Sequence, residues 1–318
     1  MARKKRSEPE PLEPLGVVSD ATRDVLRRLE LDVTRRLDGL LHGDHRGLVP
    51  GHGSELGETR RYAPGDDVRR IDWNVTARLQ EAHVRETIAE RELQTWLVVD
   101  RSARLAFGTV RSQKRELVLA GAAATGFLTN RDGNRIGAVY AGSGEPEVIP
   151  PRGSRRHFLR ILHDIAEHIP VDGEGPTDLT GALARLAGAA RRRGLVVVIS
   201  DFLVAPGWEQ PLRILAQRHD VLAVQISDPR DRELPNVGLV TLRDPATGAV
   251  REVATHKRSV RERFAEAAQE RQSRLDAEFR ASRVDHVVLS TDREWLDDLV
   301  RFVGRRSDRM ARQEAAVR

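Results

Sequence analysis

The chain has 318 residues, of which 39% are hydrophobic and 32% are charged, a balance typical of a water-soluble globular protein with one large or two modest domains. The formal net charge is +5, but acidic residues are mixed with the basic ones and only 4% of residues are aromatic, which disfavours nucleic-acid binding. The absence of cysteine excludes disulfides, thiolate metal ligands and cysteine nucleophiles. No membrane segment or secretion signal is recognisable, so we expect a cytoplasmic protein.

The N-terminal part of the chain contains two different patterns. Residues 1–19 are charged and rich in proline, so we expect a disordered tail. From Asp20 to Leu41, apolar residues recur at helical spacing, and Asp20 is placed to cap that helix. The following residues, up to 94, are rich in glycine, charge and turn-forming residues. We therefore interpret residues 20–94 as an N-terminal helix followed by a motif-bearing segment.

From residue 95, short apolar runs alternate with helical patterns, which predicts an α/β domain with a doubly wound, mostly parallel sheet over residues 95–304. Strands are expected at 95–100, 135–140, near 147–149, and at 195–200, 221–226 and 284–290. Helices are expected at 111–129, 154–168, 178–192, 208–218 and 293–304. A small hairpin (238–242 and 249–253) and a long helix (257–282) form an addition within residues 236–282, and residues 305–318 are expected to be a basic, frayed tail.

Carboxylates and hydroxyls follow the predicted strands at places that should meet in space. Asp100 ends one apolar run and Asp201 follows another, while Ser102 and Thr177 lie on loops beside them. Because ligands of open α/β sheets bind beyond the carboxyl ends of the strands, we expect the four side chains to share one crevice. Such an oxygen-only set suits a hard ion such as Mg²⁺. Each residue could also serve only as a helix cap, as Thr177 and Asp178 could before the helix at 178–192.

This arrangement resembles the von Willebrand A domain and its metal-ion-dependent adhesion site, which has an Asp-x-Ser-x-Ser turn, a threonine on a later loop and an aspartate after a central strand. Asp100, Ser102, Thr177 and Asp201 match that pattern, but Arg104 occupies the position of the second serine. Turned inward, Arg104 could pair with Asp100 or Asp201 and replace the charge of the metal. Turned outward, it would leave a metal one ligand short. Either way the site is a degenerate one: no cofactor is firmly expected, and Mg²⁺ would bind weakly.

A dense motif occupies the segment before the sheet. Its turn, Pro64-Gly65-Asp66, is followed by alternating acidic and basic residues and by two large apolar ones. We expect the segment to dock on the α/β domain through Tyr62, Ile71 and Trp73. Its charges would form an ion-paired surface that acts either as a structural clasp or as a partner-binding site. The residues assigned to that role are Arg60, Tyr62, Asp66, Asp67, Arg69, Asp72, Trp73 and Arg78.

The motif resembles that of the bacterial "domain of unknown function 58" family, which couples such a segment to a von Willebrand A-like domain. The likeness covers roughly residues 47–305 and includes the strings at 100–109, Ile199-Ser-Asp201 and 227–235. Genes of this family commonly neighbour those of MoxR-type AAA+ ATPases. The resemblance therefore implies a non-catalytic, protein-binding partner or adaptor of such an ATPase, acting in the assembly or activation of other complexes.

Two other functions compete with this interpretation. One is a metal-dependent hydrolase or phosphatase in which Asp100 is the nucleophile. Phosphatases of that kind need a second aspartate two residues later, and Ser102 stands there instead. The other is nucleic-acid binding through the arginine-rich surface. Neither finds a motif that supports it.

Overall fold

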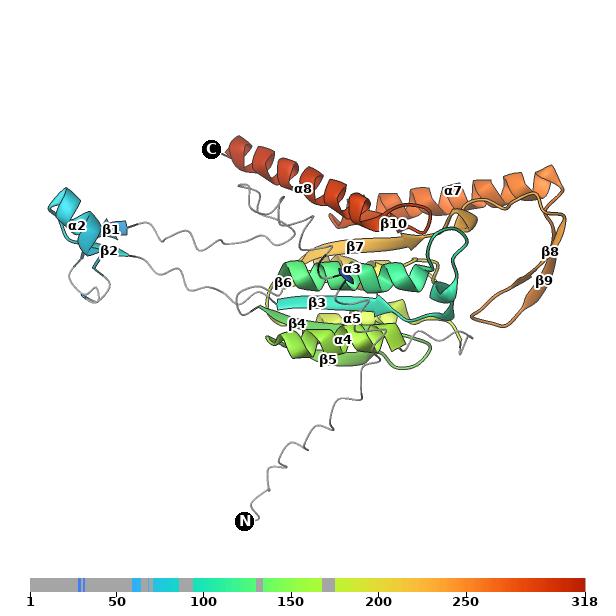
Figure 1. Ribbon diagram of the computed structural model, residues 1–318, viewed down its shortest axis with the longest axis horizontal. Coiled ribbons are helices and arrows are strands. Elements are labelled where there is room, and N and C mark those ends of the chain that lie inside the picture. Colours follow the sequence, from blue (N-terminus) through green and yellow to red (C-terminus); the bar gives the residue numbers. More distant parts are fainter. Residues whose placement is uncertain are drawn as a thin grey trace, which may run out of the picture.

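The computed structural model describes residues 28–29, 31, 59–63, 68, 71–85, 94–129, 134–167 and 175–317. Within these ranges the largest element is a six-stranded sheet with helices on both faces (Figure 1). Its strands, in spatial order, are β10 (Asp285–Ser290), β7 (Asp220–Ser227), β6 (Gly194–Ser200), β3 (Gln94–Asp100), β4 (Arg135–Ala141) and β5 (Glu147–Arg152).

The connectivity of this sheet confirms the doubly wound, mostly parallel fold. The first strand of this sheet in chain order, β3, lies in the centre; the chain moves outward through β4 and β5, then returns to β6 and moves the other way through β7 and β10. All neighbours are parallel except β5, which runs antiparallel to β4. Pro150 and Pro151 are tolerated in β5 because it is an edge strand. The direction of winding reverses between β3 and β6, which is where ligands bind in such sheets.

Helices cover each face of the sheet because the central strands are apolar on both sides. Leu97 and Val99 of β3 face a core formed with α3 (Lys114–Thr129), α4 (Arg155–Glu167) and α8 (Trp295–Val317). Trp96 and Val98 face the other core, formed with α5 (Leu179–Ala189), α6 (Glu209–Ala216) and α7 (Arg258–Ala281). Among the described helices, none combines the length and apolar character needed to cross a bilayer.

The C-terminal helix is longer than the sequence analysis predicts. Instead of ending at residue 304 and leaving a frayed tail, α8 continues to Val317. The segment after Gly304 contains no glycine or proline and is rich in good helix formers such as arginine, alanine and glutamine, so nothing in it ends the helix. Of the N-terminal helix expected from Asp20, residues 28, 29 and 31 are helical, and Leu29 packs against the core on the α3 side. The expected tail at 1–19 lies outside the described residues.

The hairpin addition has the predicted position. Strands β8 (Leu239–Arg243) and β9 (Val250–Ala254) pair with each other in antiparallel register. The turn between them is closed by a hydrogen bond from the Asp244 N–H to the carbonyl of Ala249, and Gly248 adopts φ of 70°, a conformation that side chains with a Cβ rarely adopt. The hairpin stands at the end of the sheet towards which the parallel strands point (Figure 1).

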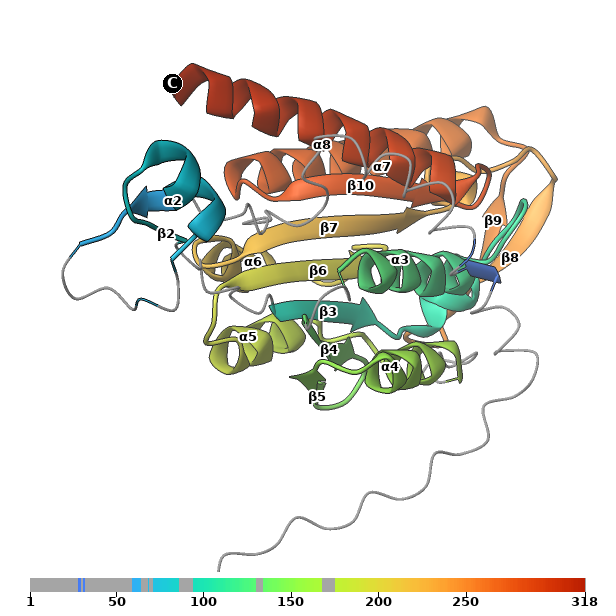
Figure 2. The same cartoon turned by 60° about the vertical axis from the view of Figure 1, so that its left-hand side comes forward.

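The motif-bearing segment forms a small unit of its own, the β1–α2–β2 unit: β1 (Thr59–Arg61), α2 (Trp73–Leu79) and β2 (His83–Arg85). Asp72 begins α2 by accepting hydrogen bonds from the N–H groups of Asn74 and Val75. Figures 1 and 2 show this unit beyond the end of the sheet that lies opposite the hairpin. The expectation that Trp73 anchors the segment on the α/β domain is wrong, because its side chain is 70% exposed and no residue of α2 is buried.

Candidate functional site

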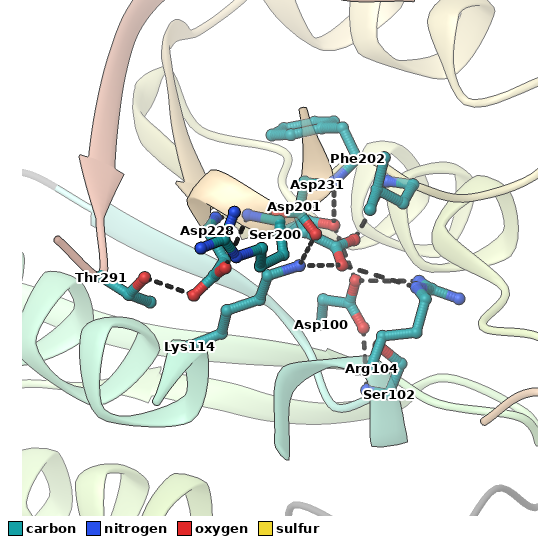
Figure 3. A network of polar contacts seen from close by, with 12 residues as sticks. Asp100, Ser102, Arg104, Lys114, Ser200, Asp201, Phe202, Asp228, Asp231 and Thr291 are labelled. Atoms are coloured by element: carbon teal, nitrogen blue, oxygen red, sulfur yellow. Dashed lines mark hydrogen bonds and ion pairs between the residues drawn. The ribbon is translucent and has the colours of Figure 1, made fainter. Parts of the chain in front are cut away.

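The structure brings the four oxygen-bearing residues together at the switch point of the sheet, and Figure 3 shows three of them, Asp100, Ser102 and Asp201. Asp100 ends β3 and Asp201 follows β6 directly, and these two strands are neighbours. The Ser102 N–H donates to Asp100 Oδ1 at 2.8 Å, and the Thr177 hydroxyl donates to the same oxygen at 3.4 Å. We refer to Asp100, Ser102, Thr177 and Asp201 as the acidic crevice. All four are buried.

Hydrogen bonds from the strand ends fix both carboxylates. The Ser200 hydroxyl donates to Asp100 Oδ2 at 2.7 Å and accepts from the N–H of Phe202. Asp201 Oδ1 accepts from the Leu203 N–H at 3.0 Å. Ser200 was not among the predicted site residues, although it lies in the Ile199-Ser-Asp201 string, because a serine that ends a buried strand does not by itself indicate a site.

Thr177 and Asp178, in the loop before α5, could each be a helix cap or a site residue according to the sequence, and the structure gives them different roles. Asp178 is the N-cap of α5, since its carboxylate accepts from the Gly181 N–H at 2.7 Å. Thr177 does not cap the helix but turns its hydroxyl towards Asp100. Helix capping therefore accounts for Asp178 and not for Thr177.

Arg104 turns inward and lies between the two carboxylates of the acidic crevice. Its Nη2 is 3.6 Å from Asp100 Oδ2, and its Nε is 3.5 Å from Asp201 Oδ2. The residue lies in the short 3-10 helix η2 (Ala103–Ala106), and its side chain is 14% exposed. Both nitrogens are buried and make ion pairs without a hydrogen bond inside the described ranges. Arg104 therefore supplies positive charge to both carboxylates from a largely buried position.

A second cation in the crevice was not predicted. Lys114, the first residue of α3, is almost completely buried, and its Nζ lies 3.3 Å from Asp201 Oδ2 and 2.9 Å from Asp231 Oδ1. The scarcity of lysine in the composition could have drawn attention to Lys114. Lys4, Lys5, Lys114 and Lys257 are the lysines of a chain that otherwise uses arginine, and Lys114 is the one within the predicted sheet region before the hairpin.

The string at residues 227–235 holds this second cation in place. Asp231 Oδ2 accepts from the N–H of Asp228, while its other oxygen pairs with Lys114. Asp228 is itself buried and accepts from the hydroxyls of Thr109 and Thr291 at 2.7 and 2.5 Å. These contacts tie β7, β10 and the loop after β3 together at the same edge of the sheet (Figure 3).

Two backbone features shape the loops around the crevice. A Cβ on Gly108 would lie 2.3 Å from the carbonyl oxygen of Ser112, so only glycine permits the turn that leads into α3. Phe202, directly after Asp201, has φ of 53°, a strained conformation for a residue with a Cβ. Its ring packs against Trp208 and Phe279 with centroids 5.3 and 5.2 Å apart, which holds the strained turn in place.

The two most buried aspartates of this region differ in their electrostatics. Burial, followed by the charge of Asp201, raises the pKa of Asp100 above its ordinary value, although Arg104 and the hydrogen bonds oppose the shift. Burial also opposes ionisation of Asp228, but hydrogen bonds from Thr291 and Thr109 more than offset it and lower the pKa of that carboxyl. Asp228 is therefore a stable structural anion, whereas burial makes ionisation of Asp100 less favourable than that of an ordinary aspartate.

The residues present do not fit the divalent metal ion that the resemblance implies. Both oxygens of Asp100 and of Asp201 are already engaged by N–H, O–H or cationic donors. A metal would also lie beside two cationic side chains, and two like unit charges 4 Å apart repel each other by about 4 kcal/mol near a protein surface. Within the ranges that the structure describes, no three histidine, aspartate or glutamate side chains are grouped to hold a metal ion.

The described residues assigned to the motif-bearing segment lie in or beside the β1–α2–β2 unit, beyond the end of the sheet opposite the hairpin (Figures 1 and 2). Tyr62 donates its N–H to the carbonyl of Ala82, and Asp72 caps α2. Trp73 and Arg78 are exposed on α2, and Arg60 belongs to β1. The remaining three, Asp66, Asp67 and Arg69, lie outside the described residues.

Fold and site together define a doubly wound α/β protein whose switch-point crevice holds carboxylates and built-in cations. The chain belongs to the family described as "Protein of unknown function DUF58", whose model matches residues 58–274. It is 49% identical to an uncharacterized protein of Mycobacterium tuberculosis, Rv1480, over 281 residues that cover 88% of each chain. An uncharacterized protein of Mycobacterium avium, MAV169, is 41% identical over 49% of this chain and 91% of its own length.

Two solved structures are similar at low sequence identity. One is the conserved hypothetical protein BatB from Bacteroides thetaiotaomicron, with a TM-score of 0.43 and 12% identity over 67% of this chain and 98% of that one. The other is the SpRpn10 VWA domain, with a TM-score of 0.37 and 15% identity over 66% of this chain and 94% of that one.

Proposed function

We propose that this protein is a non-catalytic protein-binding module that docks a MoxR-type AAA+ ATPase at the carboxyl edge of its sheet. In this role it serves as a partner or adaptor in the assembly or activation of other complexes. The choice of ATPase rests on the family resemblance. The choice of surface rests on the distribution of exposed apolar side chains.

Exposed apolar side chains gather at one end of the sheet. The large apolar side chains exposed among the described residues from 94 onward are Phe107, Val110, Ile214, Val237, Leu239, Leu242 and Val250. All except Ile214 lie on the loop after β3 or on and beside the β8–β9 hairpin, and both elements stand at the carboxyl edge (Figure 2). An exposed apolar surface beside a polar crevice is typical of a protein-docking site. We call these six residues the apolar rim.

The charge of Arg104 in the acidic crevice reaches the turn of the hairpin. Asp244, in the hairpin turn, has a lowered pKa chiefly because Thr247 and the Ala246 N–H donate hydrogen bonds to it, and Arg104 of the crevice contributes to the same shift. A hairpin of two strands is marginally stable alone, and most of β8 and β9 is exposed. A partner that covers the hairpin would stabilise it.

The state of Asp100 supports a non-catalytic role. Its side chain has no exposed surface, and its two carboxylate oxygens accept hydrogen bonds from the Ser102 N–H and from the hydroxyl of Ser200 at the end of β6. A nucleophile must reach its substrate, and Ser102 offers no acid or base in the place where a phosphatase needs one.

The proposal is tested by capture of the purified MoxR-type ATPase of the same organism on the immobilised full-length chain, with and without ATP. Leu239→Ser combined with Val250→Ser should weaken capture at least about tenfold, because both residues are exposed on the same face of the β8–β9 hairpin and provide apolar contact area at the rim. Ile214→Ser is the matched control, since it removes an exposed apolar side chain from α6. Equal capture by the wild type and both variants would refute the assigned surface, and no capture by the wild type would refute the assigned partner.

A further inference from the structure

The acidic crevice holds two cationic side chains from the same stretch of chain. Arg104 comes from the 3-10 helix after β3, and Lys114 begins α3 ten residues later. Their exposed side-chain fractions are 14% and 2%, so both charges are withdrawn from water. We call Arg104 and Lys114 the tethered cations.

Both tethered cations approach the same carboxylate oxygen. Asp201 Oδ2 lies 3.3 Å from Lys114 Nζ and 3.5 Å from Arg104 Nε (Figure 3). Arg104 extends from there to Asp100, and Lys114 extends in the other direction to Asp231. The two side chains thus place two positive charges between three carboxylates that come from three different strand ends.

The charge and position of this pair explain why the crevice does not fit a divalent ion. Two unit charges equal the charge of one divalent cation, and they are held on the carboxylates that such an ion would need. Buried carboxylates require compensation, and covalently attached cations provide it at every concentration of free metal. Arg104 alone would leave Asp231 and one side of Asp201 without a cation.

We propose that Lys114 and Arg104 act together as a built-in replacement for a divalent ion, so that the crevice keeps its shape without metal. The assignment does not depend on which protein docks at the apolar rim. It implies that neither cation alone decides the metal response: removing Arg104 still leaves the ammonium group of Lys114 on Asp201, and removing Lys114 leaves the guanidinium group. A strong divalent site appears only when both are removed.

The test compares the full-length wild type with Arg104→Ser, Lys114→Gln and the double variant in thermal unfolding. Each is measured with millimolar MgCl₂ or MnCl₂ and with NaCl of matched ionic strength. The wild type should show no divalent-specific change in Tm, and each single variant should show a small one. The double variant should be less stable without metal and should gain at least about 4 °C with Mn²⁺. Asp100→Asn in the double variant should abolish that gain.

The control is a double variant that removes two positive charges outside the acidic crevice. Arg111→Ser with Lys257→Gln removes the same two charges from exposed positions and should give no divalent response. A divalent-specific rise in the wild type that Asp100→Asn removes would overturn the proposal, and so would a folded double variant that ignores Mn²⁺. If the double variant has no cooperative transition without metal, refolding with Mn²⁺ becomes the measurement: recovery supports the proposal, and failure to recover overturns it.

Discussion

The ammonium group of Lys114 lies 3.3 Å from a carboxylate oxygen of Asp201, although 87 residues separate them in the chain. This contact joins the first turn of α3 to the end of β6, and the same ammonium reaches Asp231 beyond β7. Three separate loops at the carboxyl edge of the sheet are therefore connected through one buried cation.

Replacing that cation should strongly destabilise the fold. Lys114→Met keeps most of the side-chain length but leaves Asp201 and Asp231 without their shared partner, which should lower the free energy of unfolding by about 3–5 kcal/mol. Urea denaturation measures the change. Lys257→Met, at an exposed lysine, is the control and should change stability by less than about 0.5 kcal/mol. Similar small effects in both variants would show that the ion pairs of Lys114 do not stabilise the fold.

The pH dependence of stability should reveal the buried carboxyl of Asp100. Its pKa is raised in the folded protein above the ordinary 3.8, so the folded state binds this proton more tightly than the unfolded state does. Its contribution to stability is therefore greatest near or below pH 3.8 and falls as the pH rises through the folded pKa. The stability of the wild type relative to Asp100→Asn should decrease as the pH rises above 3.8 and through the folded pKa of Asp100.

Denaturant unfolding of both proteins across that range measures the difference. Asp292→Asn, at an exposed carboxyl, is the control: its free energy of unfolding should change with pH in the same way as that of the wild type. If the wild type instead becomes more stable relative to Asp100→Asn as the pH rises, the pKa of Asp100 is lowered in the folded protein.

Asp228 should behave in the opposite way. Thr291→Val preserves the shape of a fully buried side chain but removes its 2.5 Å hydrogen bond to Asp228, so stability at neutral pH should fall by about 1–3 kcal/mol. Because the pKa of Asp228 is lowered on folding, its contribution is present above pH 3.8 and is lost as the pH falls through the folded pKa. The difference in the free energy of unfolding between the wild type and Thr291→Val should therefore become smaller in acid. Thr241→Val, at an exposed position of β8, is the control and should unfold with nearly the same free energy as the wild type at each pH.

The exposed position of Trp73 changes what its removal should do. With 70% of the side chain exposed, Trp73→Ala should lower the free energy of unfolding by less than about 1 kcal/mol, against about 3–5 kcal/mol for a buried ring. Chemical denaturation measures stability, and the ATPase capture assay is run in parallel. Loss of capture with normal stability would assign Trp73 to partner binding. A loss of several kcal/mol would instead show that the ring is covered by the rest of the chain in solution.

The sequence by itself determined most of the secondary structure of the sheet domain and the order of its elements along the chain, but not the end of α8. The apolar runs and helical periodicities are local properties, so the strand at 195–200 and the hairpin strands appear within a residue or two of their predicted bounds. The same reasoning placed Asp100 and Asp201 at one edge, because strands that alternate with helices run parallel and end on the same side. It also left open whether Arg104 turns inward, since a side-chain direction depends on neighbours that spacing does not reveal.

Only the tertiary structure decided which side chains meet across the sheet and which remain uncovered. In the sequence, Lys114 looks like an ordinary charged residue at the start of a helix. Its role depends on Asp201 and Asp231, which come together only when β6 and β7 pair. Trp73 reads as an anchor because large aromatic rings are usually buried, yet burial requires a surface to pack against. Composition and spacing describe what each residue can do; contacts between distant strands determine what it does.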